Sequence, residues 1–450
     1  MKERTRTLTR RDFLRLTAVT ASGALLAACG PAPVTEAPAT SAPAEKPTEQ
    51  PAAAGGQTVR MGVWASPEEF NFFQEWVKPF QDKSGIEVKI EYVDWTTYWT
   101  KLPTQFSAGN ATDVIEMSNY ILQFGPQNVL ADLNPLIDRD KINRDDYVKA
   151  PFEKFIYQGK LLSFPMGLTI QMLSYNLDIF DKAGIKAPTK DWTWNDMLET
   201  ATQLTVDKNG KHPNEDGFDL ANVTQWGIEM SLDEESGWAP LVFQNGGEYW
   251  NADYTVPNFT DPKVVEAFQF LADLINKHHV APSPTQSQKF GGSPFQAGQA
   301  AMARLGTYML VPLRDNIKTF KWDVTVPPKG KQKGVFADGI GWTLNAATKV
   351  QDAAWSLMKY FLTDGQTFMG ERKWQVPILK KAFSSFATPP PDHAGDLAEQ
   401  FDYGHRWPSY KNGNQIDDII GQVTTQLWDG KTSAEEATKE VQDKVAPLAK

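Results

Sequence analysis

The stretch TVRMGVWASPEEFNFFQEWVKPFQDKSGIEVKIEYV, residues 58–93, alternates between two structural patterns. Thr58–Trp64 predicts a strand. Pro67–Ser84 predicts a helix, because proline suits a first helical turn and Gly85 supplies a stop signal. Ile86–Val93 then alternates apolar and polar residues, as a half-buried strand does. A strand, a helix and a second strand in succession indicate an open α/β sheet.

The same alternation continues along the chain. We expect a helix near Thr96–Ala108 and a short strand at Asp113–Met117, and Leu161–Tyr175 indicates strand material broken at Pro165 and Gly167. Further elements are expected as a helix from Thr193 to Leu204, a helix at Pro262–His278, strands at Trp322–Val326 and Val335–Leu344, helices at 351–363 and 414–428, and a last helix that begins with a capping box at Ser433.

Composition narrows the class of protein. The chain has 450 residues, of which 41% are hydrophobic and 22% charged, so most of it is globular. Its net charge of −10 argues against a nucleic-acid binder, which needs a basic face. One Cys and five His are too few for a typical zinc site or a disulfide framework. Asp207 and Asn209 have the spacing of part of a calcium-binding loop, but Lys211 stands where that loop needs an oxygen ligand. We expect no metal and no cofactor.

The first 28 residues form a targeting segment, to be excluded from the fold. They carry six basic residues against two acidic ones, and their apolar run from Leu16 to Ala28 is too short to span a bilayer. Thr9–Arg15 resembles the twin-arginine export signal, and Leu26–Cys29 resembles a bacterial lipobox. Cys29 would then carry the lipid, which predicts an exported protein anchored to the outer face of the cytoplasmic membrane.

Residues 29–56 are predicted to be the lipidated cysteine and a tether. Among residues 30–56, six are Pro, eight are Ala and three are Gly, with no aromatic residue. A segment of this composition buries too little apolar surface to offset the loss of chain entropy. The globular part therefore begins near residue 57.

Six short motifs occur in order along the remaining chain. They are GKLLSFP at 159–165, SYNLD at 174–178, FQAGQAAM at 295–302, GTY at 306–308, GIGW at 339–342 and AAW at 353–355. Together they resemble the extracellular solute-binding proteins of ABC importers, in the group that includes maltose- and other sugar-binding proteins. The resemblance extends over about residues 57–450.

The resemblance implies a fold of two α/β lobes, the class II periplasmic-binding-protein-like fold, in which each lobe is an open sheet flanked by helices and the two meet at a hinge. By it, lobe one takes residues 57–168 and 338–405, and lobe two takes 169–337 and 406–450. The implied function is non-catalytic: the protein captures a sugar, expected to be an oligosaccharide, in the cleft and delivers it to the permease subunits of an ABC importer. A monomer is expected.

Sugars offer C–H faces that stack on aromatic rings and hydroxyl groups that need hydrogen-bond partners. Candidate ligand-binding residues therefore lie at strand ends and loop starts, where open sheets place ligands. In lobe one these are Trp64, Ser66, Trp95, Ser118, Asn119 and Tyr120. In lobe two they are Trp238, Asn245, Thr307 and Tyr308, with Asp338 and Trp342 near the hinge and Trp374 either lining the cleft or packing beneath it. Trp76, Trp192, Trp194 and Trp355 are interpreted as packing residues.

Three alternatives stay open at this point. A secreted glycoside hydrolase needs paired carboxylates, and one sequence cannot place such a pair face to face. The same fold could instead bind a polyamine, a peptide or another small solute, and Glu68, Glu229 and Asp338 could contribute to a polyamine site. A surface lipoprotein that serves adhesion is the third alternative.

Overall fold

The computed structural model describes residues 56–450, except for 149, 253, 289–291, 409–411 and 450. The predicted export signal, Cys29 and all of the tether but Gly56 lie outside the described residues. Within the described part of the chain, no helix combines the length and the apolar character that crossing a bilayer requires. The described residues belong to one compact unit, Ala53–Lys450.

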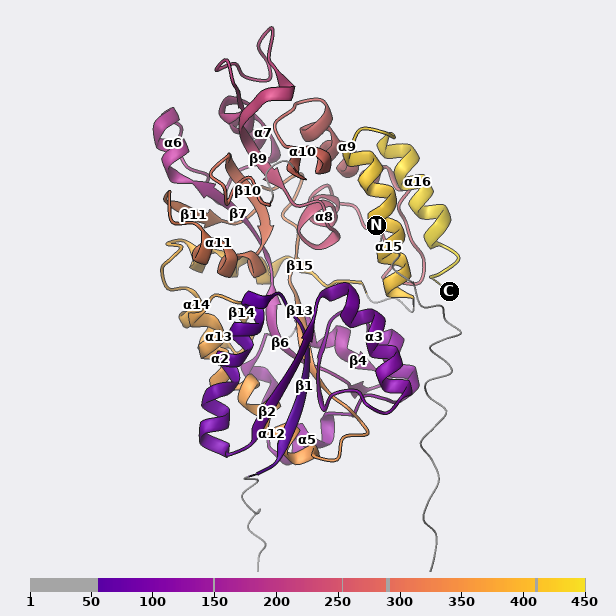
Figure 1. The fold of residues 1–450 in the computed structure, drawn as a ribbon. Coiled ribbons are helices and arrows are strands. Elements are labelled where there is room, and N and C mark those ends of the chain that lie inside the picture. The colour runs from indigo at the N-terminus through magenta and orange to yellow at the C-terminus, as the bar shows by residue number, and fades with distance from the viewer. Residues whose placement is uncertain (1–55, 149, 253, 289–291, 409–411, 450) are drawn as a thin grey trace, which may run out of the picture. The chain divides into compact units, whose positions relative to one another are not determined.

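Six strands form the first sheet, in the order β14-β6-β13-β3-β1-β2 (Figure 1). They are β1 (Thr58–Trp64), β2 (Glu87–Val93), β3 (Val114–Met117), β6 (Phe164–Thr169), β13 (Asp338–Leu344) and β14 (Val376–Pro377). β1 is parallel to β2 and β3, whereas β13 is antiparallel to β3 and β6. The helices that pack on this sheet are α2 (Pro67–Ser84), α3 (Trp95–Ser107), α12 (Gln351–Leu362) and α13 (Asp364–Glu371). We call the sheet with these helices the first lobe.

Five strands form the second sheet, in the order β11-β7-β10-β9-β8. They are β7 (Gln171–Asn176), β8 (Val206–Asp207), β9 (Val223–Met230), β10 (Ala300–Gly306) and β11 (Trp322–Thr325). The second lobe also contains α6 (Leu177–Ala183), α7 (Trp194–Leu204), α8 (Ala239–Gln244), α9 (Pro262–Asn276), α15 (Gly413–Trp428) and α16 (Ala434–Val445). The two C-terminal helices, yellow in Figure 1, pack against α9. The predicted residue boundaries of the lobes stay predictions.

The chain passes from the first sheet to the second through a single residue. β6 ends at Thr169 and β7 begins at Gln171, so Ile170 alone separates them. The prediction of breaks at Pro165 and Gly167 is wrong, because both residues lie within β6. β13 shifts its register beside Pro165, between Ile340 and Gly341, and this bulge accommodates a residue that lacks a backbone N–H.

Local sequence signals account for most of the other elements. The predicted strand Thr58–Trp64 and helix Pro67–Ser84 are confirmed, and Gly85 ends that helix in the left-handed conformation at φ 70°. The single strand predicted at Val335–Leu344 is two strands, because Ala337 separates β12 (Val335–Phe336), which pairs with β15 (Gly404–His405), from β13.

The remaining elements are short. The strands are β4 (Ile156–Tyr157) and β5 (Lys160–Leu161), and the α-helices are α4 (Ile121–Phe124), α5 (Asn134–Arg139), α10 (Pro284–Ser287), α11 (Leu310–Asn316) and α14 (Phe383–Phe386). The 3₁₀ turns are η1 (Gly125–Gln127), η2 (Arg144–Asp146), η3 (Ala150–Phe155), η4 (Leu220–Asn222), η7 (Thr307–Met309), η8 (Lys380–Ala382) and η9 (Ala394–Asp402), and η5 (Glu234–Trp238) is a π-helical turn.

Candidate ligand-binding site

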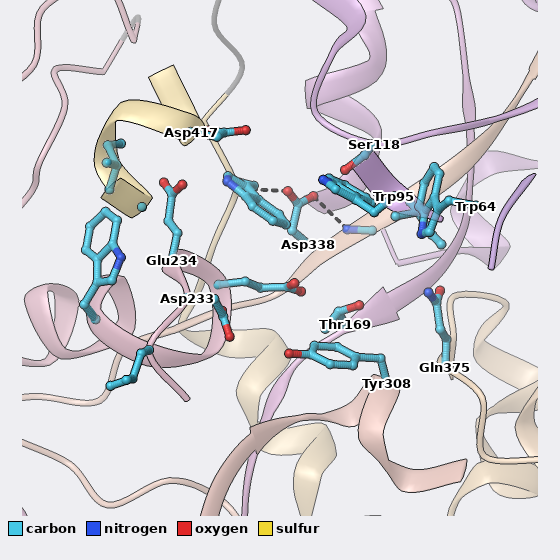
Figure 2. A pocket seen from close by; sticks show the side chains of 18 of the residues that line it. Trp64, Trp95, Ser118, Thr169, Asp233, Glu234, Tyr308, Asp338, Gln375 and Asp417 are labelled. Atoms are coloured by element: carbon cyan, nitrogen blue, oxygen red, sulfur yellow. Dashed lines mark hydrogen bonds between the residues drawn. The ribbon is translucent and has the colours of Figure 1, made fainter. Parts of the chain in front are cut away.

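A cavity of about 470 Å³ lies between the two lobes (Figure 2). This volume falls in the range of small-molecule sites, about 300 to 1,000 Å³. The cavity is lined by Trp64, Glu69, Trp95, Ser118, Lys154, Thr169, Leu232, Asp233, Glu234, Glu235, Trp238, Tyr308, Asp338, Gly339, Ile340, Trp374, Gln375, Trp407, Asp417, Ile420, Gly421 and Thr424. We call it the interlobe cavity.

Two tryptophans form the aromatic wall on the first lobe. Trp64 is the last residue of β1 and Trp95 is the first residue of α3, so both stand at carboxyl ends of parallel strands. Their rings meet edge to face, with centroids 4.9 Å apart and an interplanar angle of 80°. Trp95 keeps 38% of its surface exposed, which leaves part of its ring for a ligand. The backbone N–H of Trp64 donates to the buried Glu116 at 3.1 Å, which holds the end of β1.

Tyr308 faces the cavity from the second lobe, in the turn η7 that follows β10 (Figure 2). A Cβ on Gly306 would collide with the Tyr308 ring and with Ser236 Oγ, so glycine is required there. Trp238 also lines the cavity, but it is 1% exposed and packs edge-on against Tyr249 at 4.9 Å. Tyr308 is half-buried, so it is the more accessible of the two residues.

Trp374 combines the two roles that the sequence left open. It borders the cavity, yet it is only 4% exposed. Its ring stacks on Phe72 at 4.7 Å with an interplanar angle of 27°. Trp374 thus supports the cavity wall mainly by packing, while the neighbouring Gln375 presents an amide group.

A buried ion pair lies at the hinge side of the cavity. Lys154 Nζ donates to Asp338 Oδ2 at 2.8 Å, and each side chain is 2% exposed. Asp338 Oδ2 also accepts the backbone N–H of Trp407 at 2.8 Å, and its Oδ1 accepts the N–H of Gly339 at 2.7 Å. The pair joins η3, β13 and the segment that precedes α15, which come from distant parts of the sequence.

The rest of the charged lining is acidic. Burial, with the charges of Asp233 and Asp338, raises the pKa of Glu235 to about 8, although Lys154 opposes that shift. Burial and the neighbouring Glu234 raise the pKa of Asp417 well above its ordinary range. Both carboxyl groups therefore hold their protons to a higher pH than exposed acids do.

We predict that Glu235→Gln will flatten the pH dependence of stability. Because the pKa of Glu235 is raised in the folded state, its contribution to stability is complete below about pH 4.5 and is lost as pH rises towards about 8. Glutamine carries no charge, so the melting temperature of the variant should fall less than that of the natural chain between about pH 5 and about pH 8. Thermal unfolding across this range measures the slope, and an equally steep fall in the variant would contradict the prediction.

Four polar atoms of the cavity wall are buried without a hydrogen-bond partner among the described residues. They are Ser118 Oγ, Gln375 Oε1, Trp407 Nε1 and Asp417 Oδ1. A buried polar atom without a partner costs about 1–3 kcal/mol, so native proteins rarely keep one without a reason. These four atoms, a hydroxyl group, a donor and two acceptors, come from both lobes and suit a polar ligand.

Three predicted residues of the first lobe do not line the cavity. Ser66 instead caps α2: its hydroxyl accepts the N–H of Glu69 at 3.2 Å, and the Glu69 carboxylate accepts the N–H of Ser66 at 2.7 Å. Tyr120 is buried behind the wall, where its hydroxyl donates to Asp417 Oδ2 at 2.9 Å. Asn119 is 1% exposed, and its amide has no partner among the described residues. These three residues were predicted to bind the ligand, and none of them is among the residues that line the cavity.

Three more predicted ligand-binding residues are absent from the cavity lining. Asn245 ends α8, and its amide donates to Lys263 O at 2.8 Å, away from the cavity. Thr307 is fully buried, and its hydroxyl accepts the N–H of Ile170 at the crossover. Trp342 is also fully buried, since β13 turns its side chain into the core of the first lobe. These residues make contacts within the protein around the site, and their side chains do not form its surface.

Several lining residues escaped the sequence analysis. Three acids in succession, at residues 233–235, precede Trp238, and such a run directly before a predicted site residue was a usable signal. Lys154, Gln375, Trp407 and Asp417 carry no comparable local signal. The Asp207 loop, considered for calcium, uses its carboxylate to accept backbone N–H groups, including that of Lys211 at 2.9 Å. In the described residues no group of three His, Cys, Asp or Glu could hold a metal ion.

Comparisons with known proteins agree with this architecture. The sequence profile described as bacterial extracellular solute-binding protein matches residues 75–381. The diacetylchitobiose-binding protein DasA of Streptomyces coelicolor is 25% identical, over 69% of this chain and 70% of that protein. The arabinooligosaccharide-binding protein of Bacillus subtilis is 25% identical, over 67% of each chain. An ABC substrate-binding protein of Listeria monocytogenes, solved with cycloalternan, is 27% identical with a TM-score of 0.77, covering 87% of this chain and 98% of that one. This likeness confirms the predicted two-lobe fold.

Proposed function

Since the chain belongs to the bacterial extracellular solute-binding proteins, we propose that it captures an oligosaccharide in the interlobe cavity and delivers it to the permease of an ABC importer. The relatives named above bind diacetylchitobiose, arabino-oligosaccharides and cycloalternan. All three ligands present C–H faces for stacking and hydroxyl groups for hydrogen bonds.

The observation that carries the proposal is the composition of the cavity wall. Trp64 and Trp95 on one lobe and Tyr308 on the other offer ring surfaces from opposite sides. The four buried atoms that have no partner among the described residues lie in the same wall, where hydroxyl groups of a sugar would complete their hydrogen bonding. An apolar ligand would leave those atoms unsatisfied at a cost of about 1–3 kcal/mol each.

The proposed mechanism is a shift between open and closed states. A ligand that contacts both lobes binds the closed state better, and it shifts the equilibrium by that difference in affinity. The permease would then recognise the closed form. Micromolar affinity corresponds to about 8 kcal/mol, which a few stacked rings and completed hydrogen bonds can supply.

Export and anchoring are part of the proposal. The twin-arginine pattern and Cys29 support a lipoprotein held at the outer face of the cytoplasmic membrane, with the tether between anchor and lobes. A single acyl chain gives only marginal membrane binding, so more than one chain would be needed at Cys29. Mass spectrometry of the membrane-extracted protein tests for the acylated cysteine.

Calorimetric titration of the purified chain tests the proposed function. Maltotriose, an arabino-oligosaccharide and diacetylchitobiose should be compared with spermidine and a tripeptide. We expect saturable micromolar binding of at least one oligosaccharide, with a rise in melting temperature that follows ligand concentration. Binding of spermidine or the tripeptide alone, or hydrolysis of a glycoside by the chain, would overturn the proposal.

A further inference from the structure

A hydrogen bond joins the two lobes beside the interlobe cavity. Tyr120 lies between β3 and α4 and packs in the core of the first lobe, whereas Asp417 lies on α15 of the second lobe. The Tyr120 hydroxyl donates to Asp417 Oδ2 at 2.9 Å, although the two residues are 297 positions apart. Figure 2 shows the Asp417 carboxyl group directed away from its helix, toward the elements of the first lobe that carry Ser118. Any motion that separates the lobes at this place breaks the bond.

The ring of Tyr120 is held by the first lobe alone. Its centroid lies 4.2 Å from that of Trp99 and 6.3 Å from that of Trp95, and both tryptophans belong to α3. Trp99 is itself 3% exposed and is part of the core of this lobe. These contacts persist when the lobes move apart, so the first lobe presents the hydroxyl at a fixed place. The bond to Asp417 is then an additional contact, made when the second lobe arrives.

Both partners of the bond adjoin the space for the solute. Asp417 lines the interlobe cavity, and so does Trp95, whose ring contacts that of Tyr120. Tyr120 itself is 1% exposed and is not a lining residue. A solute that contacts Trp95 on one lobe and α15 on the other favours the arrangement in which the bond is made.

The bond does not depend on the charge of Asp417. Burial, together with the neighbouring Glu234, raises the pKa of Asp417 well above its ordinary range. A carboxyl group keeps an acceptor oxygen whether or not it carries a proton, so the Tyr120 hydroxyl can donate to it in both states. Removing the hydroxyl would leave that oxygen buried without this donor while the lobes are together, whereas water would reach it when they are apart.

Resting on the proposed function, we propose that Tyr120 is a positioning residue that latches the two lobes over the captured solute through its hydrogen bond to Asp417. The latch does not touch the solute. Release of the solute requires the lobes to separate and the bond to break, whereas capture occurs in the open state, before the bond has formed. The hydroxyl of Tyr120 should therefore act mainly on the rate of dissociation.

Tyr120→Phe tests the latch, because it removes the hydroxyl and keeps the ring. The probe is whichever of maltotriose, an arabino-oligosaccharide and diacetylchitobiose binds the natural chain. We expect calorimetry to show an affinity about tenfold weaker, and stopped-flow fluorescence to show that faster dissociation accounts for most of this loss. Unchanged affinity, or a loss caused by slower association, would overturn the inference and leave the proposed function intact. A natural chain that binds none of the three sugars would overturn both.

Tyr147→Phe is the matched control, since it removes a buried hydroxyl that bonds within one lobe. Tyr147 is 3% exposed, belongs to the core of the first lobe and lies outside the cavity lining. Its hydroxyl donates to Leu362 O at 3.0 Å, in the same lobe. The melting temperature of this variant should fall, while its affinity for the sugar stays within about twofold of the natural value. If Tyr147→Phe weakened binding as much as Tyr120→Phe does, the effect would be a general loss of stability and the latch would be wrong.

A double-variant cycle tests whether Asp417 is the partner. Asp417→Ala removes the acceptor, so adding Tyr120→Phe to it should weaken binding by less than about twofold more. Asp417 also lines the cavity, and the cycle cancels whatever its substitution does to the solute directly. An equal loss from Tyr120→Phe with and without Asp417 would show that the hydroxyl does not act through this residue.

Discussion

Tyr308→Ala is expected to weaken binding of the solute by about thirtyfold, with little change in the melting temperature of the free protein. The ring of Tyr308 lines the interlobe cavity from the second lobe, opposite Trp64 and Trp95. Removing it takes away a stacking surface and opens the site to water, and central aromatic residues of a binding site commonly contribute about 2 kcal/mol or more. The turn η7 itself is held by backbone hydrogen bonds, among them Thr307 N to Ile170 O at 2.8 Å, which the substitution leaves in place.

Two further variants give this experiment its controls. Tyr308→Phe keeps the ring and should retain most of the affinity, because stacking rather than the hydroxyl is the larger contribution. Tyr92→Ala removes an aromatic ring that is 40% exposed, stacks on Phe70 at 4.2 Å and lies outside the cavity, so affinity should stay unchanged. Calorimetric titration measures all three. A large loss of melting temperature with full affinity in Tyr308→Ala would show that the ring belongs to the core.

Lys154→Met is expected to lower the free energy of unfolding by about 3 kcal/mol or more. Lys154 and Asp338 are 2.8 Å apart, and both side chains are 2% exposed. Methionine fills the space of the lysine stem but leaves the Asp338 carboxylate buried, and the donors that remain to it in the described part of the chain are the backbone N–H groups of Gly339 and Trp407. Breaking one side of a buried pair leaves an uncompensated charge, which is much more costly than losing an exposed pair.

Denaturant unfolding measures this effect against two comparisons. Lys208→Met breaks a surface pair, Lys208 to Asp219 at 2.9 Å, and should cost less than about 1 kcal/mol. The double variant Lys154→Met with Asp338→Asn removes both charges and should recover more than half of the loss. If the double variant is no more stable than Lys154→Met, the loss comes from packing rather than from the buried charge.

Four of the predicted site residues that line the cavity share one property. Trp64 ends a strand of the first sheet, Trp95 and Ser118 follow strands of that sheet, and Tyr308 follows β10 of the second. Open sheets bring the ends of their strands to one edge, so a residue at a strand end reaches that edge in most such folds. Ser66 and Thr307 stand beside these residues in the sequence, and yet a cap on α2 and a bond to the crossover occupy their side chains.

Two of the residues that sequence analysis missed contact predicted residues from distant segments. Lys154 is 184 positions from Asp338, and Asp417 is 297 positions from Tyr120. No local pattern marks Lys154 or Asp417, because each side chain acquires its role only when another segment lies beside it. The burial of Trp342 in the core has the same origin, since the direction of its side chain depends on which face of β13 meets the core.

By itself, the sequence determined most of the strands and helices and an open α/β sheet, because hydrophobic period, proline, glycine and capping residues act within one or two turns of chain. The two-lobe class of fold was expected from the resemblance of six short motifs to the solute-binding proteins. Tertiary structure alone decided which side chains line the interlobe cavity and which acids lie close together there. It also decided that Lys154, the single lysine of the described lining, pairs with Asp338. Burial and charge are properties of neighbours in space, and packing of the two lobes sets those neighbours.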